Sequence, residues 1–90
     1  MDKAATALKK LRREIGNIDA KIVALIAKRL ALAKRVGKAK KQLGLPVYQV
    51  QREKKVVARV LAASKKAKVD LKFAKSLFKQ IIAASRSVQK

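Results

Sequence analysis

Residues 8–43 read LKKLRREIGNIDAKIVALIAKRLALAKRVGKAKKQL, and their apolar residues recur with the period of an α-helix. Counting in sevens, one column contains Leu8, Ile15, Ile22, Arg29, Val36 and Leu43, and a second contains Leu11, Ile18, Leu25, Leu32 and Ala39. Across residues 3–43 the only helix-breaking residues are Gly16 and Gly37. The spacing therefore predicts one helix over about 3–43, about 60 Å long at 1.5 Å per residue.

The remainder of the chain predicts two shorter helices. Gly44 and Pro46 follow the long helix in the order typical of a helix end, and 45–50 reads as a loop. A second helix is expected over about 51–66. Asp70 is a candidate N-cap for a third helix that runs to the C-terminus. Its inner line would contain Ala74, Phe78, Ile81, Ser85 and Val88. The predicted fold is all-α, a three-helix protomer in a single domain of residues 1–90.

The length of the first helix predicts a dimer. A compact chain of this size has a radius of gyration near 12 Å, so the ends of a helix of about 60 Å would protrude. Leu8, Leu11 and Ile15 would then be exposed to water. A second copy of the chain that covers this face is the favoured hypothesis.

The composition restricts the chemistry. The chain contains neither cysteine nor histidine, which excludes disulfides, thiolate metal sites and imidazole acid–base catalysis. We expect no metal and no cofactor. No segment reaches the roughly eighteen apolar residues of a membrane-spanning helix. The chain therefore reads as a cytoplasmic protein with no membrane partner.

The charge is the second compositional feature. Twenty-five Lys and Arg residues against five acids give a formal net charge of +20. Nucleic-acid binding is the commonest use of such an excess, although the cations are spread over all polar faces and aromatic residues are scarce. A highly basic helical nucleic-acid-binding protein, or incidental polyanion binding, is therefore an alternative. A charge this large is also typical of a surface that has been engineered.

Several polar residues fall on apolar faces, where they indicate a site. Arg29 interrupts the apolar seam, and a guanidinium in such a position needs an anion beside it. A ligand or an internal carboxylate could supply this anion. Alternatively, the Arg29 side chain extends out of the seam to solvent. Glu53 shares a face with Val56 and Val60, although the helix dipole also favours an acid in a first turn. Ser85 lies on the inner line of the third helix, where a serine is often a packing spacer.

These residues would converge if the short helices fold back along the long one. Lys40 lies three turns beyond Arg29 on nearly the same face, although an isolated lysine is usually solvated. Gln89 follows Ser85 by four residues. The resulting cavity would contain Arg29, Lys40, Arg52, Glu53, Ser85 and Gln89. It suits an anionic substrate whose reaction needs positioning and electrostatics rather than proton transfer.

The same residues and their surroundings resemble the all-helical chorismate mutases. The resemblance is carried by LRREIGNIDAKIVALIAKRLALAKRVGKAK, LGLPVYQVQRE and LFKQIIAASRSVQ, which cover nearly the whole chain. It implies a three-helix protomer in an intertwined homodimer with active sites shared between the chains. It also implies a cofactor-free rearrangement of chorismate to prephenate in phenylalanine and tyrosine biosynthesis.

The resemblance assigns roles to individual residues. Arg29 and, from the partner chain, Arg12 would hold the two carboxylates of chorismate. Lys40 and Gln89 would donate to the ether oxygen. Glu53 would accept from the ring hydroxyl, with Ser85 at a carboxylate and Arg52 as a supporting residue.

One position of the sequence departs from the pattern of the chorismate mutase family. Gln49 stands where the family usually has an acid. If this position acts through its backbone N–H, the change is mild. If it acts through its side chain, we expect lower turnover, because an amide cannot supply the charge of a carboxylate.

An isochorismate–pyruvate lyase of the same fold is an alternative function, since it would also need two carboxylate clamps and a lysine. The pairing of Glu53 with Gln89 favours the mutase.

Overall fold

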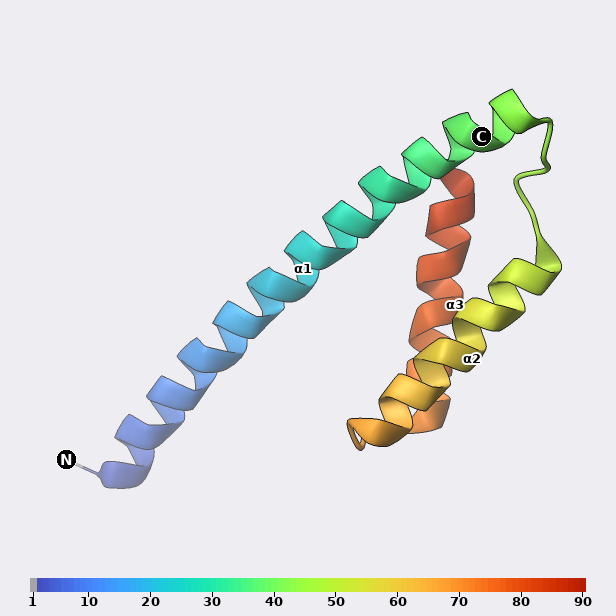
Figure 1. Ribbon diagram of the computed structural model, residues 1–90. Coiled ribbons are helices and arrows are strands. Elements are labelled where there is room, and N and C mark those ends of the chain that lie inside the picture. Colours follow the sequence, from blue (N-terminus) through green and yellow to red (C-terminus); the bar gives the residue numbers. More distant parts are fainter. Residues whose placement is uncertain (1) are drawn as a thin grey trace.

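The computed structural model describes residues 2–90 and consists of three helices joined by short connections. In chain order these are α1 (Lys3–Leu43), α2 (Val50–Lys66) and α3 (Leu71–Ser87), as Figure 1 shows. Residues 2–90 contain no strand. The prediction of an all-α fold with one long N-terminal helix is confirmed.

The ends of α1 follow from its capping residues. The Asp2 carboxylate accepts a hydrogen bond of 2.9 Å from the Ala4 N–H and satisfies a free donor of the first turn. At the other end, Gly44 adopts φ 69°, and its N–H bonds back to the last turn. Only glycine adopts this left-handed conformation at little steric cost, so the chain leaves the helix there. The predicted range of 3–43 is confirmed.

Helix α3 begins as predicted but ends earlier. The Asp70 carboxylate accepts a hydrogen bond of 2.8 Å from the Phe73 N–H, which confirms Asp70 as the N-cap. The helix ends at Ser87, so the prediction that it continues to the C-terminus was wrong. Val88, expected on the inner line, is the C-cap residue of α3 and is 37% exposed. Gln89 lies in the turn that follows α3.

Helix α3 packs against both α1 and α2. Figure 1 shows the α2–α3 hairpin beside the C-terminal half of α1, while the N-terminal half of α1 projects away from it. The molecule measures 65 × 24 × 16 Å and has a radius of gyration of 17.7 Å. That radius exceeds the value near 12 Å typical of a compact chain of this length. The predicted protrusion of α1 is confirmed.

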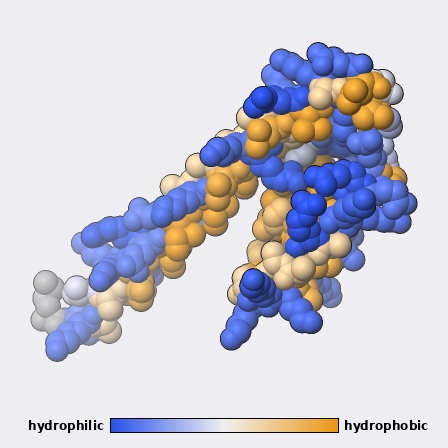
Figure 2. All heavy atoms as spheres, viewed as in Figure 1, coloured by the Kyte–Doolittle hydropathy of each residue, from blue (hydrophilic) through white to orange (hydrophobic). Residues whose placement is uncertain are grey.

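One side of α1 is apolar and uncovered. The buried apolar residues of the described chain are Ala33 in α1 and Ala74 and Ile82 in α3. Towards the N-terminus of α1, the seam residues are each 47–57% exposed: Leu8, Leu11, Ile15, Ile18 and Ile22. Figure 2 shows an apolar strip along one edge of α1, with polar side chains on the opposite edge. Within residues 2–90, no helix is both long enough and apolar enough to cross a membrane.

Candidate active site

A cavity of about 580 Å³ lies where the C-terminal half of α1 meets α2, α3 and the loop before α2. Apolar side chains from all three helices form part of its wall. Its polar wall contains seven of the eight predicted site residues, namely Arg29, Lys40, Gln49, Arg52, Glu53, Ser85 and Gln89. The chain fold therefore brings together residues that are as much as sixty positions apart in the sequence.

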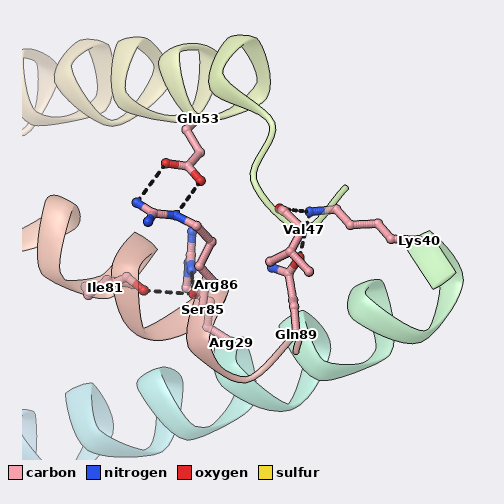
Figure 3. A network of polar contacts seen from close by, with 8 residues as sticks. All are labelled: Arg29, Lys40, Val47, Glu53, Ile81, Ser85, Arg86 and Gln89. Carbon is pink, nitrogen blue, oxygen red and sulfur yellow. Dashed lines mark hydrogen bonds and ion pairs between the residues drawn. The ribbon is translucent and has the colours of Figure 1, made fainter. Parts of the chain in front are cut away.

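Arg29 is held at the cavity wall by α3. Its Nη1 donates a hydrogen bond to Ser85 Oγ, and Ser85 Oγ in turn donates to the Ile81 carbonyl oxygen over 2.8 Å (Figure 3). Ser85 is buried and Arg29 is half-buried. The single ion pair among residues 2–90 involves other side chains, so no carboxylate in this range neutralises Arg29. A guanidinium has five N–H donors, so several remain free to bind a ligand carboxylate.

Lys40 connects the end of α1 to two other segments. Its Nζ donates to the Val47 carbonyl oxygen over 2.7 Å and to Gln89 Oε1 over 2.6 Å, as Figure 3 shows. An ammonium group has three donors, so one N–H is still available. The Gln89 amide presents its oxygen to Lys40, which leaves its two N–H donors for a ligand. Lys40 and Gln89 thus form a pair of donors on one side of the cavity.

Glu53 lies at the other side of the cavity and is paired with Arg86. Arg86 Nε donates to Glu53 Oε2 over 2.8 Å, and Arg86 Nη2 donates to Glu53 Oε1 over 3.2 Å (Figure 3). The Arg86 guanidinium carbon also lies 4.6 Å from the centroid of the Tyr48 ring, within the range of a cation–π interaction. These contacts fix the carboxylate and compensate its charge. Each carboxylate oxygen retains a lone pair that can accept from a ligand hydroxyl.

Arg86 is the site residue that the sequence analysis missed. It is one of twenty-five basic residues, and its position beside Ser85 does not distinguish it from the others. One signal was present, because an inward carboxylate such as Glu53 needs a cationic partner. The sequence did not indicate which cation would reach it. In the structure, Ser85 bonds to Arg29, Arg86 to Glu53 and Gln89 to Lys40. The end of α3 and the turn that follows it therefore organise the site.

The three remaining predicted residues lie in different places. Gln49 is the N-cap residue of α2, makes no side-chain capping bond and is half-buried at the cavity. Arg52, in the first turn of α2, lines the cavity and is exposed. Arg12 is exposed on the projecting half of α1 and does not line the cavity. It is seventeen residues from Arg29, which corresponds to about 25 Å along the helix.

The chemistry of this cavity favours an anionic ligand. Three cationic side chains line it, and Arg86 compensates the charge of its one acid. Within residues 2–90 there is no cluster of three or more acidic, histidine or cysteine side chains that would hold a metal ion. The side chains are suited to donate hydrogen bonds to carboxylates and to an oxygen that gains negative charge.

Known proteins are similar to this chain in sequence and in fold. Residues 11–90 match the family described as chorismate mutase type II. A chorismate mutase from Methanocaldococcus jannaschii is 37% identical over 83 residues, which cover 92% of this chain and 84% of that protein. A bifunctional chorismate mutase/prephenate dehydratase from Aquifex aeolicus is 40% identical over 58 residues, which cover 64% of this chain and only 16% of that longer protein.

A solved structure described as a conserved hypothetical protein from Pyrococcus furiosus aligns with a TM-score of 0.73 and 36% sequence identity. The alignment covers 94% of this chain and 97% of that one. The match of residues 11–90, together with the M. jannaschii relative aligned over most of both chains, shows that the chain belongs to the type II chorismate mutase family.

Proposed function

We propose that the cavity binds chorismate and catalyses its rearrangement to prephenate, which makes the chain an isomerase. The observation that carries this proposal is the arrangement of Arg29, Lys40 and Gln89 around one cavity of about 580 Å³. In the rearrangement the ether C–O bond of chorismate breaks while a C–C bond forms within the same molecule. No electron acceptor or proton carrier takes part, so the protein contributes by orienting the substrate and stabilising charge.

Arg29 binds one substrate carboxylate. Its contact with buried Ser85 orients the guanidinium without neutralising it, so the full positive charge is directed to the ligand. A guanidinium forms paired hydrogen bonds with a carboxylate and fixes its angle as well as its position. This restraint holds the substrate in the folded conformer from which the reaction proceeds, and it lowers the entropic part of the barrier.

Lys40 and Gln89 act on the ether oxygen. Negative charge grows on this oxygen as the C–O bond breaks, so donors directed at it bind the transition state more tightly than the substrate. The free N–H of Lys40 and the amide N–H groups of Gln89 are the donors. The hydrogen bond between the two side chains supports this role, because it holds them in a fixed relative position before the substrate arrives.

Glu53, Arg52 and Gln49 complete the part of the site contributed by one chain. Glu53 accepts a hydrogen bond from the ring hydroxyl of the substrate with a lone pair that Arg86 leaves free. Arg52 adds positive charge at the mouth of the cavity. Gln49 is placed to bind the substrate through its backbone N–H or its side-chain amide. Neither group carries the charge of a carboxylate.

The second carboxylate of the substrate is bound by Arg12 of a partner chain in a homodimer. Arg12 and Arg29 point about 100° apart around the same helix and are about 25 Å apart along it, so one molecule of chorismate cannot contact both from one chain. The exposed apolar strip of α1 supports the dimer, since a second copy of α1 would bury it. Two copies would then exchange their N-terminal halves and complete two sites.

The test is an assay of the purified protein with chorismate. We expect loss of the ultraviolet absorbance of the chorismate diene, with prephenate identified by chromatography. Isochorismate serves as the matched control substrate, and release of pyruvate from it would indicate lyase activity. Prephenate without pyruvate supports the proposal, whereas a rate equal to that of the uncatalysed reaction contradicts it.

A further inference from the structure

Gly37 is buried in α1 at the point where the C-terminal turn meets that helix. A Cβ atom placed on Gly37 would lie 2.7 Å from Gln89 Cα, 2.8 Å from Gln89 O and 2.9 Å from Gln89 Cβ. All three distances are shorter than real Cβ contacts, and two of these neighbours are backbone atoms. The backbone of Gln89 therefore occupies the space that any side chain at position 37 would need.

We propose that Gly37 is a positioning residue for the reaction, because its missing side chain sets how closely Gln89 approaches α1. This inference rests on the proposed function, in which Gln89 donates to the ether oxygen. Gly37 does not touch the substrate; it acts through the position of Gln89. Position 37 thus controls the geometry of the donor pair formed by Lys40 and Gln89.

The turn that carries Gln89 cannot move without disturbing the site. The Gln89 N–H donates to the Arg86 carbonyl oxygen over 3.1 Å, and the Arg86 side chain is bound to Glu53 on α2. The Gln89 side chain is bound to Lys40, one turn of α1 beyond Gly37. A methyl group at position 37 would push the turn away from α1, whereas these bonds hold Gln89 to the Lys40 side chain and to the backbone of Arg86. The strain would fall on the Lys40–Gln89 contact.

The size of the displacement indicates a large effect on rate. Ordinary contact begins at about 3.4 Å, so Gln89 Cα would have to withdraw by about 0.7 Å to accommodate a methyl group. A misplacement near 1 Å at a reacting centre can cost about 100-fold in rate. We therefore expect Gly37→Ala to lower kcat by at least about 10-fold, with a smaller change in KM, since Arg29 still binds its carboxylate.

Gly16→Ala is the matched control. Gly16 lies in the same helix, and nothing lies within 4 Å of a Cβ placed on it. Both substitutions replace glycine by a better helix former, so both should keep the helical circular dichroism signal and neither should lower the melting temperature through helix propensity. We expect Gly16→Ala to leave kcat unchanged. Equal kcat values for Gly37→Ala and Gly16→Ala, or loss of the helical signal in Gly37→Ala, would overturn the proposal.

A double-mutant cycle with Gln89→Ala tests whether Gly37 acts through Gln89. Gln89→Ala should by itself lower kcat by about 10²- to 10³-fold. If Gly37 works by placing the Gln89 amide, Gly37→Ala should have little further effect on kcat in the Gln89→Ala background. If the kcat of the double variant is lowered by the product of the two single effects, Gly37 acts independently of the amide, and the proposal is contradicted.

A measurement that needs no activity separates this inference from the proposed function. In a ¹⁵N NMR spectrum, the side-chain amide of Gln89 should shift in Gly37→Ala and stay in place in Gly16→Ala. A wild-type protein that does not convert chorismate would contradict the proposed function, while the amide shift would still report the position of Gln89. An active wild type whose Gln89 amide does not respond to Gly37→Ala would overturn the inference alone.

Discussion

Arg86 Nε lies 2.8 Å from Glu53 Oε2, so an ion pair joins the end of α3 to the first turn of α2. The side chain of Arg86 is 37% exposed and that of Glu53 is 21% exposed, which makes the contact partly shielded from solvent. Glu53 lines the cavity whereas Arg86 lies behind it. In the proposed function, this pairing would allow an acid to lie close to a dianionic substrate, because Arg86 compensates the charge of Glu53.

We predict that Arg86→Gln raises KM by about 5- to 10-fold and changes kcat less. Removal of the cation leaves the Glu53 charge uncompensated beside a substrate of the same sign, and a partly exposed pair of this kind corresponds to roughly 1 kcal/mol. Steady-state kinetics measure the change. Arg59→Gln, at an exposed position of α2, is the control for loss of one positive charge. Identical KM values for the two variants would show that Arg86 has no specific role.

Lys40→Ala is predicted to lower kcat by about 100-fold or more. The substitution deletes a donor whose interaction strengthens in the transition state, and it also releases the loop held at the Val47 carbonyl oxygen. Lys66→Ala, in the exposed last turn of α2, should leave kcat within experimental error of the wild type. Small and equal effects at the two positions would mean that Lys40 is an ordinary surface lysine.

Mixed dimers test the shared site. Arg12→Ala and Arg29→Ala homodimers should each be nearly inactive, since each lacks one carboxylate clamp in both sites. After the two variants are refolded together in equal amounts, about half the dimers should be heterodimers that contain one intact and one doubly defective site. The mixture should recover roughly a quarter of the wild-type activity. If mass spectrometry shows heterodimers but the mixture stays inactive, the two arginines do not form one site across the dimer.

A change in ionic strength should alter KM for chorismate more than it alters kcat. With a net charge of +20, the protein should attract a dianion from solution, and salt screens this attraction. We expect KM to rise strongly between low salt and 0.5 M, where the screening length is about 4 Å, while kcat falls little. Initial rates over a range of chorismate concentrations at each salt concentration measure both constants. A KM that does not change over this range would exclude electrostatic steering.

The sequence by itself determined the helices and most of the residues that meet at the cavity. The seven-residue repeat, Gly44 and the Asp70 cap are local signals, because helix periodicity and capping depend on residues only a few positions apart. They predicted α1 to its observed ends and the start of α3. Arg29, Glu53 and Ser85 could be identified because a polar group on an apolar face needs a partner that the local sequence does not provide.

Only the tertiary structure decided which residues pair across the helices. The contact of Arg86 with Glu53 joins residues 33 positions apart, and nothing local distinguishes Arg86 from the other basic residues. The close approach of Gln89 to Gly37 likewise depends on where α3 ends and how it packs against α1. A hydrogen bond or a steric contact depends on separations of a few tenths of an ångström, and those separations are set by the packing of whole helices.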